Sequence, residues 1–363
     1  MIKMAELCKK CFIEFFHPSQ YDIDHIVMSK DNDFCESCMN CGPYVDHIGT
    51  DEEVARMNKP KLIMMVGLPC SGKSTYSQEL AKEHNATVFS SDALRAELFG
   101  DINEQSRNNE LFVELHKRIK NCLASGKSAI YDACNHHYKE RMAFLQQLNK
   151  IPCEKICVVM ATPYEECIRR SFERERHVPE YVIERMYRSF DPPYWYEGWN
   201  DIQIEFSNGS CKSRSFLDWM STVSYFNQDN SHHTLTLGQH SEKALDYIFE
   251  NVRDIDDHSI ALRGAGALHD NGKCFTKTFK NSKGEITDQA HYYNHEHVGS
   301  YDVLFYNMAC NILDVAVMIR WHMQPYYWEK DNNEKLHNKY CKLWGEELYR
   351  DIMKLHEADK AAH

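Results

Sequence analysis

The chain has 363 residues, of which 43% are hydrophobic and 26% charged, and its formal net charge is −12. This composition is typical of globular domains and excludes collagen-like, disordered and coiled-coil chains. At about 100–200 residues per domain, the length corresponds to about two or three domains. The apolar run Leu62–Leu68 is far shorter than the ~20 residues that cross a bilayer. We therefore expect a cytoplasmic protein with no signal peptide and no membrane contact.

The charge differs between three parts of the chain. Residues 1–58 have a net charge of −6, residues 59–207 of −1 and residues 208–363 of −5. None of these parts has the basic excess of a domain that attracts nucleic acid through a broad positive field. A polyphosphate or nucleic-acid ligand must therefore be held by a few placed residues and by metal ions.

Fifteen cysteines are present, and five of them lie within the first 41 residues. An odd number spread over a long chain argues against a secreted disulfide framework. Two C-x-x-C pairs, Cys8 with Cys11 and Cys38 with Cys41, can give four thiolates to one structural Zn²⁺. Cys35 with Cys38 is a competing pair, so Cys35 is the alternative to Cys41, and free buried cysteines are the alternative to zinc. Residues 1–58 are thus predicted to form a zinc-ribbon-like segment.

From Lys59 on, short apolar runs alternate with helical patterns. Alternation of strands and helices predicts a parallel sheet with helices on both faces, so residues 59–207 are expected to form an α/β domain. Beyond a linker at Ser207–Ser210 the strand signal fades, and residues 208–363 are expected to be all-α. The expected strands are Leu62–Val66, Thr87–Phe89, Ser128–Tyr131 and Ile156–Met160; the expected helices are Ser74–Glu83, the stretch from Leu111 to Cys122, Tyr138–Leu148 and Tyr164–Phe172.

The segment from Gly67 to Thr75 fits the pattern G-x-x-x-x-G-K-[ST] between an expected strand and an expected helix. In this pattern backbone N–H groups surround the β-phosphate, the lysine reaches the β- and γ-phosphates, and the hydroxyl after it binds Mg²⁺. A chance Gly/Ser turn is the alternative. The residues expected to bind ATP and Mg²⁺ are Gly67, Ser71, Gly72, Lys73, Ser74 and Thr75, with Asp132 and Asn135 after the third strand.

Two further groups suit phosphoryl transfer. Asp92 follows the second strand, where a carboxylate can deprotonate an acceptor hydroxyl, and Arg95 lies one helical turn later, where it can bind a phosphate on the acceptor. Arg170 and Arg174 project from one helical face and can close over the transferring phosphoryl group. Their alternative is a solvated face paired with nearby glutamates.

Together, these residues resemble the kinase domain of phage-type polynucleotide kinases over residues 61–206. The motifs that carry the resemblance are Gly67–Thr75, Ser91–Arg95, Tyr131–Asn135 with Arg141, and Arg170-x-x-x-Arg174. The resemblance implies that Asp92 is the general base for a 5′-hydroxyl of RNA or DNA and that Arg95 contacts the acceptor's phosphate. It also implies that Lys73, Arg170 and Arg174 hold the phosphates of ATP.

The C-terminal part contains histidines and aspartates in the order H…HD…D. Imidazole and carboxylate together suit a divalent transition metal that activates water, although each histidine alone is more often a surface or core residue. The order resembles the HD phosphohydrolase superfamily over residues 216–363. The resemblance implies one ion on His240, His269, Asp270 and Asp359, with Asp270 also catalytic and bridging to a second ion that His295 and His322 complete. Mn²⁺, Fe²⁺ or Ni²⁺ would suit these ligands.

Joining the two resemblances predicts a bifunctional enzyme that heals nucleic-acid ends. One module would phosphorylate 5′-hydroxyl ends, and the other would remove a 2′- or 3′-phosphate or open a 2′,3′-cyclic phosphate. The expected partners are RNA or DNA ends, with a functional link to a polynucleotide ligase. A kinase of nucleosides or small metabolites fused to an HD nucleotide phosphohydrolase is the first alternative, and a nucleotide-sensing regulatory protein is the second.

Overall fold

The computed structural model describes residues 7–29, 33–39, 41–42, 44–51, 59–207, 214–231, 234–253, 255–330 and 332–363, without the side chains of residues 33–34 and 41–42. The chain forms two compact units. The first comprises Met1–Pro60 with Pro152–Glu154, and the second comprises Lys61–Ile151 with Lys155–His363. The second unit therefore contains most of both segments for which the sequence predicts separate domains. The predicted linker lies outside the described residues except for Ser207.

The described residues of the first unit form two short helices and two strand pairs. Ser19 caps the second helix in a reciprocal capping box with Asp22, which satisfies amide groups that the first turn leaves unpaired. The elements are α1 (Lys9–Phe16), α2 (Gln20–Asp24), β1 (Ile26–Met28) antiparallel to β4 (Val45–Ile48), and β2 (Asp33–Phe34) antiparallel to β3 (Cys41–Gly42).

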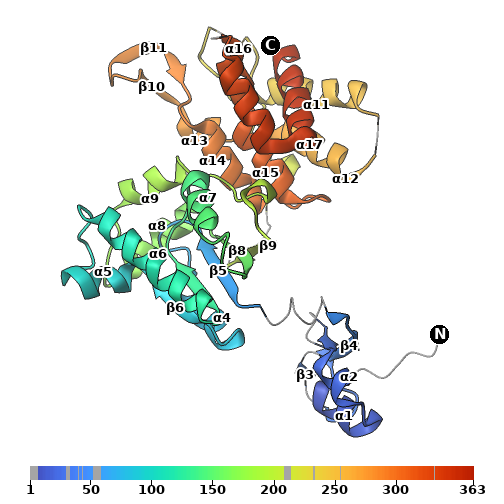
Figure 1. Ribbon diagram of the computed structural model, residues 1–363. Coiled ribbons are helices and arrows are strands. Elements are labelled where there is room, and N and C mark those ends of the chain that lie inside the picture. Colours follow the sequence, from blue (N-terminus) through green and yellow to red (C-terminus); the bar gives the residue numbers. More distant parts are fainter. Residues whose placement is uncertain are drawn as a thin grey trace. The chain divides into compact units, whose positions relative to one another are not determined.

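A five-stranded sheet organises the first part of the second unit (Figure 1). Its strands lie in the order β6-β7-β5-β8-β9, and β5 pairs with β7, β6 with β7 and β8 with β9 in parallel. Central β5 is apolar on both faces, as expected for a parallel strand covered by helices. The strands are β5 (Lys61–Val66), β6 (Thr87–Ser90), β7 (Ala129–Asp132), β8 (Glu154–Ala161) and β9 (Asp201–Phe206).

The helices between these strands agree closely with the predicted ones. Helix α6 has the clearest pattern, because Leu111, Leu115 and Ile119 recur at helical spacing and are all buried. Helix α5 contains the helical turn from Asp92 to Arg95 that the sequence analysis expected. Helix α9, which the sequence analysis did not predict, follows Pro179 and has a short apolar face. The helices are α4 (Lys73–Glu83), α5 (Ser91–Phe99), α6 (Asn108–Ala124), α7 (Tyr138–Gln147), α8 (Tyr164–Glu173), α9 (Glu180–Tyr187) and the 3-10 turn η1 (Trp195–Glu197).

The described residues in the rest of the second unit are mainly helical, as predicted, and include one hairpin. The hairpin strands are mostly exposed and have no apolar alternation that would identify them in the sequence. The elements are α10 (Phe216–Val223), α11 (Leu237–Asn251), α12 (Asp257–Leu268), α13 (Lys273–Thr276), β10 (Thr278–Lys280), β11 (Ile286–His291), α14 (His295–Asp302), η2 (Val303–Phe305), α15 (Ile312–Trp321), α16 (Gln324–Lys330) and α17 (Glu334–Ala361).

The helical region contacts the segment between α9 and η1 through buried polar pairs. The Arg320 Nε lies 2.6 Å from the Asp191 Oδ1, and both side chains are largely buried. The Tyr194 hydroxyl donates to the Asp314 Oδ1 at 2.7 Å. Because polar groups pair across this contact instead of being left unsatisfied, they fix how the helices meet the sheet region.

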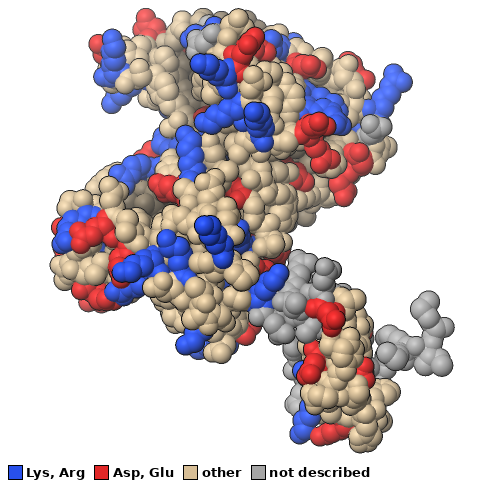
Figure 2. All heavy atoms as spheres, viewed as in Figure 1, with Lys and Arg blue, Asp and Glu red and all other residues tan. Residues whose placement is uncertain are grey.

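The surface carries both signs of charge. Figure 2 shows Lys and Arg side chains interspersed with Asp and Glu over the visible face of the second unit. None of the described helices is both long enough and apolar enough to cross a membrane.

Candidate functional site

The loop after β5 adopts the backbone conformation that its glycines permit. Gly67 has φ +151°, and a Cβ there would lie 2.9 Å from the main-chain oxygen of Met160. Gly72 has φ +98° and forms the N-cap of α4. The loop therefore wraps closely around the N-terminus of α4, where free amides and the helix dipole favour a phosphate group.

The side chains of this loop are arranged around the expected phosphate position. The Lys73 Nζ is buried and donates to the main-chain oxygens of Gly67 and Leu68, at 3.0 and 2.5 Å. Ser74 and Thr75 are exposed on the first turn of α4, so their hydroxyls are accessible to a ligand. Ser71 is buried below them.

The end of β7 brings Asp132 and Asn135 to the same loop. Burial raises the pKa of Asp132, whereas a hydrogen bond with Ser74 and the charge of Lys73 act in the opposite direction. The Asn135 Nδ2 donates to the main-chain oxygen of Met65 at 2.8 Å. Asp132 thus lies beside the hydroxyl expected to bind Mg²⁺, while the amide of Asn135 is used to hold the loop against β5.

Both predicted arginines of α8 and its C-cap lie near the phosphate-binding loop. An Nη1 of Arg170 is 3.8 Å from the position that a Cβ on Gly72 would occupy. The Arg174 Nη1 lies 3.4 Å from the Cys70 Sγ. Arg170 is also paired with Glu166, at 2.6 Å. Arg170 therefore lies near the loop and is paired with a glutamate at the same time, although the sequence analysis gave these as alternatives.

Asp92 lies on the first turn of α5, with its side chain 47% exposed and held between two arginines. Its Oδ1 is 2.9 Å from the Arg95 Nη1, and its Oδ2 is 2.6 Å from the Arg176 Nη1. Arg95 is anchored by a second bond, from Nη2 to the Asn108 Oδ1 at 3.0 Å. Arg176 and Asn108 were not predicted: Arg176 lies two residues beyond the motif Arg170-x-x-x-Arg174, and Asn108 belongs to no motif that the sequence analysis identified.

Arg141, a member of the motif set that carries the kinase resemblance, donates through Nη1 to the main-chain oxygen of Asn135 at 2.9 Å. Its guanidinium forms two bonds with the Glu197 carboxylate, at 2.8 and 2.6 Å, and both side chains are fully buried. A fork of this kind satisfies both charges inside the core. Arg141 therefore has a structural role in holding α7 to η1.

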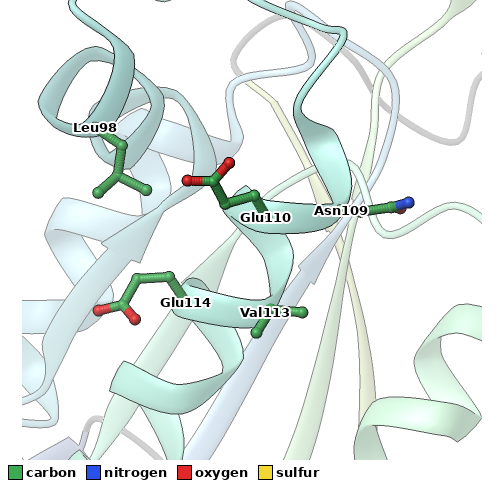
Figure 3. A pocket seen from close by; sticks show the side chains of 5 residues that line it. All are labelled: Leu98, Asn109, Glu110, Val113 and Glu114. Atoms are coloured by element: carbon green, nitrogen blue, oxygen red, sulfur yellow. The ribbon is translucent and has the colours of Figure 1, made fainter.

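A groove of about 410 Å³ lies between α5 and α6 and is separate from these residues. Figure 3 shows the carboxylates of Glu110 and Glu114 on the side of α6 that faces Leu98. Glu110 is paired with Arg107 and Glu114 with Arg118. None of the predicted phosphate-binding residues lines the groove.

The six predicted metal ligands of the helical region converge on Asp270 in two groups. His240, His269 and Asp359 offer ligand atoms within 4.8 Å of one another, and so do Asp270, His295 and His322. The Asp270 Oδ2 lies 3.3 Å from the His240 Nε2, whereas its Oδ1 lies 3.2 Å from the His295 Nε2. One carboxylate therefore faces both groups, as a bridging ligand would.

All four histidines direct Nε2 inward and Nδ1 outward. Because each Nδ1 lies near a carbonyl oxygen that can accept its hydrogen, the Nε2 of each ring in its neutral form would offer a lone pair to a metal ion. Two such atoms, of His240 and His269, are only 3.0 Å apart, an arrangement that a cation between them would stabilise. The Nδ1 partners are the main-chain oxygens of Ala362, Gly266, Tyr292 and Ile319, for His240, His269, His295 and His322 respectively.

Two further polar residues complete this cluster. The buried Lys273 Nζ lies 2.6 Å from the Asp270 Oδ2, and the Tyr326 hydroxyl donates to the Asp359 Oδ2 at 3.0 Å. Although burial raises the pKa of Asp270, Lys273 and His269 outweigh burial and hold that pKa well below its usual range. Lys273 was not predicted, although its position three residues after Asp270 places it on the same helical side.

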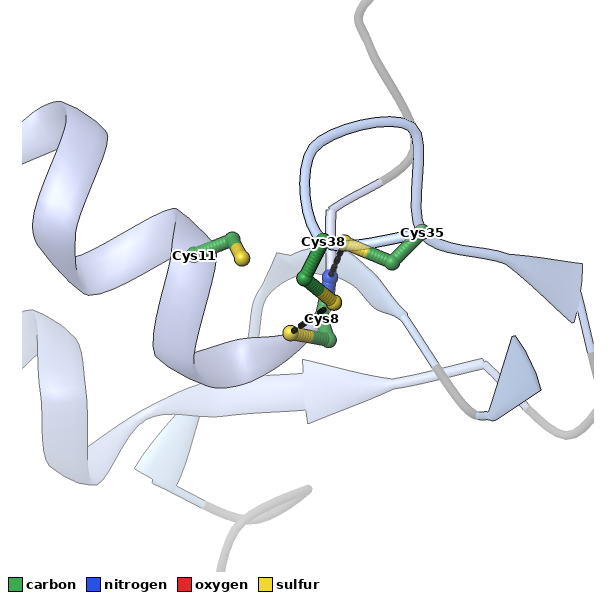
Figure 4. A group of neighbouring side chains, drawn as sticks. All are labelled: Cys8, Cys11, Cys35 and Cys38. Carbon is green, nitrogen blue, oxygen red and sulfur yellow. Dashed lines mark hydrogen bonds between the residues drawn. The ribbon is translucent and has the colours of Figure 1, made fainter. Parts of the chain in front are cut away.

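A third cluster lies in the first unit, where four cysteine sulfurs gather (Figure 4). Cys8, Cys11, Cys35 and Cys38 have sulfur atoms within 4.8 Å of one another. The set thus contains Cys35, the alternative that the sequence left open; the side chain of Cys41 lies outside the described residues. Backbone amides of Cys38 and Cys8 lower the pKa of Cys35 to about 6, which favours the thiolate that zinc requires.

The sheet region is the part of the chain that matches a known protein family. Residues 62–193 match the AAA domain family. An L-seryl-tRNA(Sec) kinase of Methanococcus maripaludis is 25% identical over 149 residues, which are 40% of this chain and 58% of that protein. The chain therefore spans a little over half of that relative.

The solved structures that match part of this chain include a protein of an RNA repair complex and a protein bound to ADP-AlF3. A chain of the Pnkp1/Rnl/Hen1 RNA repair complex is 23% identical with a TM-score of 0.33, over 36% of this chain and 43% of that one. Kti12 of Chaetomium thermophilum with ADP-AlF3 is 16% identical with a TM-score of 0.34, over 40% and 89%. With its phosphate-binding loop and parallel sheet, the region from β5 to β9 has a P-loop α/β fold.

Proposed function

We propose that the chain is a bifunctional enzyme that heals nucleic-acid ends, with RNA as the favoured substrate. The P-loop kinase region would transfer the γ-phosphoryl group of ATP to a 5′-hydroxyl. The helical region would remove a 2′- or 3′-phosphate or open a 2′,3′-cyclic phosphate. The observation that supports this best is that an Asp92–Arg95 pair beside a P-loop and a double histidine cluster around Asp270 share one compact unit.

In the kinase step, the 5′-oxygen forms a bond to the γ-phosphorus while its proton passes to Asp92. The bond between that phosphorus and the β–γ bridging oxygen breaks, and ADP leaves. Lys73, Arg170 and Arg174 would offset the negative charge on the phosphoryl oxygens, and Ser74 with Asp132 would hold Mg²⁺ directly or through water. Arg95 would bind a phosphate of the acceptor strand.

In the hydrolytic step, the inward Nε2 atoms and the carboxylates of Asp270 and Asp359 would hold one or two divalent transition metal ions. A metal ion bound there supplies a hydroxide at neutral pH. Lys273 would offset charge on the substrate phosphate beside Asp270. Cleaved RNA often carries a 5′-hydroxyl and a blocked 3′-end, so the two activities together would yield ends suited to a polynucleotide ligase.

The four clustered cysteines, Cys8, Cys11, Cys35 and Cys38, would hold a structural Zn²⁺. Four thiolates are the usual tetrahedral set for such an ion, and the sulfur positions in Figure 4 leave the metal a common centre. The first unit is small, so metal binding would supply stability that its short elements cannot.

The test uses the whole protein with ATP labelled at the γ-position and a short RNA that carries a 5′-hydroxyl and a 3′-phosphate. We expect label on the 5′-end with Mg²⁺, and release of inorganic phosphate from the 3′-end with Mn²⁺, Fe²⁺ or Ni²⁺. A DNA oligomer and a 2′,3′-cyclic phosphate end distinguish the substrate classes. Absence of both label and release would contradict the proposal.

A second candidate is phosphorylation of another primary hydroxyl, because Asp92 can deprotonate any such group. The relative from Methanococcus maripaludis is named as a kinase of L-seryl-tRNA(Sec), which favours including seryl-tRNA and free nucleosides as parallel acceptors. Label only on seryl-tRNA or only on nucleosides would replace the end-healing proposal. Tight ATP binding without transfer to any acceptor would favour a nucleotide-sensing protein.

A further inference from the structure

A second groove, of about 440 Å³, lies between α7 of the sheet region and the first half of α17 in the helical region. We call it the α7–α17 groove. Both helices contribute lysines and apolar side chains to it, and none of the residues assigned above to ATP, to the acceptor or to a metal ion lines it. Its lining includes Lys139, Met142, Ala143, Lys339, Lys342 and Leu343.

The three lysines of this groove have no acidic partner. None of their ammonium groups forms an ion pair or a hydrogen bond in the part of the chain that the structure describes, although Glu140 and Glu346 are near them in the sequence. Lys139 and Lys339 each lie over the ring of the tyrosine next to them in the sequence, at 5.8 and 5.5 Å from the ring centre. Three like charges therefore line one groove of a chain whose net charge is −12, and a bound anion would relieve their mutual repulsion.

The lining of the groove suits a ligand that has both phosphates and flat apolar parts. Exposed ammonium groups bind phosphates as point charges, with little demand on geometry. The side chains of Met142, Ala143 and Leu343 offer apolar surface between the lysines. Grooves that bind single-stranded nucleic acid combine these two properties, because positive charges follow the backbone while the bases contact uncharged surface.

The position of the groove favours a nucleic-acid strand over an acidic protein segment. Helix α7 begins at Tyr138, three residues after Asn135, whose amide holds the phosphate-binding loop against β5. Tyr138 lines the groove, and its ring packs edge-on against Trp321 with centroids 5.3 Å apart. Trp321 directly precedes the candidate metal ligand His322. The groove is thus bordered by segments that continue to both candidate sites, and a nucleic-acid strand is the anion that both sites would share.

We propose that the α7–α17 groove binds the single-stranded RNA beyond its reacting end, with Lys139, Lys339 and Lys342 contacting its phosphates. This rests on the proposed function in healing nucleic-acid ends. Because the groove lies outside both sites, it adds affinity for strands long enough to reach it and contributes nothing to a dinucleotide acceptor. The three lysines are therefore binding residues for the strand and take no part in the chemical steps.

The test replaces all three lysines in the whole protein, as Lys139→Gln, Lys339→Gln and Lys342→Gln together. Fluorescence anisotropy measures binding of a labelled RNA of about 20 nucleotides at several salt concentrations. We expect the dissociation constant to rise by about tenfold or more. The slope of its logarithm against the logarithm of the salt concentration should fall by about 2, because each single-strand phosphate contact contributes about 0.7. In transfer assays the KM for this RNA should rise with little change in kcat, so that its advantage over a dinucleotide is lost.

A matched control has the same loss of charge outside the groove. Lys82→Gln, Lys127→Gln and Lys243→Gln together remove three exposed lysines that do not line it, and this protein should keep an affinity and a salt slope close to those of the wild type. A second groove variant, Ala143→Glu, places a carboxylate at an exposed position of α7 and keeps all three lysines. It should also weaken RNA binding, because the new charge repels the phosphates.

An equal loss of affinity in the groove triple variant and in the control would show that overall charge binds the RNA, and would overturn the inference. Unchanged RNA binding in both groove variants would overturn it too, as would a groove that binds poly-glutamate and no RNA. If RNA binding depends on the groove but no 5′-hydroxyl is labelled, the groove is supported and the proposed kinase function is contradicted.

Discussion

The hydroxyl of Tyr301 donates a hydrogen bond to the main-chain oxygen of Thr162 at 2.7 Å. Thr162 in turn donates through its Oγ1 to the main-chain oxygen of Ser71, at 2.9 Å, within the phosphate-binding loop. Tyr301 lies on α14, whose first residue is His295. Two buried hydrogen bonds therefore connect the helix of a candidate metal ligand with the loop that would hold ATP.

Removing the Tyr301 hydroxyl should weaken both stability and ATP binding. In Tyr301→Phe the ring keeps its contacts with Phe190 and Tyr187. The main-chain oxygen of Thr162 loses its hydroxyl donor, and the Thr162 amide loses the hydroxyl as acceptor. We expect the free energy of unfolding to fall by about 1–3 kcal/mol and the KM for ATP to rise, as measured by urea denaturation and steady-state kinetics. Tyr293→Phe, at a position 41% exposed, is the control and should change neither the free energy of unfolding nor the KM for ATP. If Tyr301→Phe also changed neither quantity, the hydrogen bonds between α14 and the loop would not contribute to stability or to ATP binding.

Replacing the proposed general base should separate ATP binding from transfer. Asp92→Ala should lower kcat for the RNA acceptor by about 10²–10⁴-fold, while the ATP dissociation constant changes little, because the role proposed for Asp92 involves the acceptor hydroxyl and not the phosphates of ATP. Single-turnover transfer and fluorescence titration with a nucleotide analogue measure the two quantities. Transfer at the wild-type rate would remove Asp92 from the mechanism.

The metal content should follow the two groups around Asp270. His322→Ala removes a ligand from one group only, so it should lower the bound transition metal from two ions toward one, as measured by elemental analysis. Asp270→Asn weakens both groups, and it should abolish phosphate release while 5′-labelling continues. Asp288→Asn, on an exposed part of β11, should keep metal and activity. An unchanged metal content in Asp270→Asn would contradict the bridging assignment.

The cysteine cluster should stabilise the first unit and have no effect on the stability of the larger unit. Cys35→Ser should reduce bound zinc and make residues 7–51 sensitive to limited proteolysis, because the unit would lose its central ligand set. The transition of the larger unit in a thermal scan should stay in place. Cys153→Ser, at a half-buried position outside the cluster, is the control, and full zinc content in Cys35→Ser would point to a different ligand set.

The buried pair of Asp191 and Arg320 should make stability depend on pH. Burial raises the pKa of Asp191, but the Arg320 guanidinium outweighs burial and holds that pKa well below its usual range. The carboxylate therefore adds stability above the ordinary aspartate pKa of about 3.9, and this contribution is lost as the pH falls toward the lower pKa of the folded state. Asp191→Asn should cost about 3–5 kcal/mol at pH 7.

This cost should shrink in acid, because the wild type then loses the same charge. Urea denaturation of both proteins at pH 7 and at progressively lower pH measures the difference. Asp246→Asn, on the exposed side of α11, should show no such dependence. A difference that stays constant with pH would mean that the charge of Asp191 does not contribute.

Much of the fold could be predicted because its signals are local. One contiguous segment contains the apolar run of β5, the glycines of the loop and the helix that begins at Lys73. The conformation of each of these elements is favoured by residues that are neighbours in the sequence. The hairpin β10–β11 could not be predicted, because its strands are short and exposed and depend on pairing with each other. The dipeptide His269-Asp270 pointed to the candidate metal ligands, whereas Lys273 beside them belongs to no motif that would have predicted it.

The partner that each side chain contacts is determined by the packing of segments that are distant in the sequence. Arg141 and Arg176 look alike in the sequence, yet the first is buried against Glu197 and the second lies on Asp92. Choosing Cys35 for the sulfur cluster likewise depends on how α1 meets the loop after β2. A long side chain can reach many partners, and the partner it meets depends on the positions of segments far away in the chain. Local sequence therefore sets which chemical groups are present, and the tertiary structure sets which of them meet.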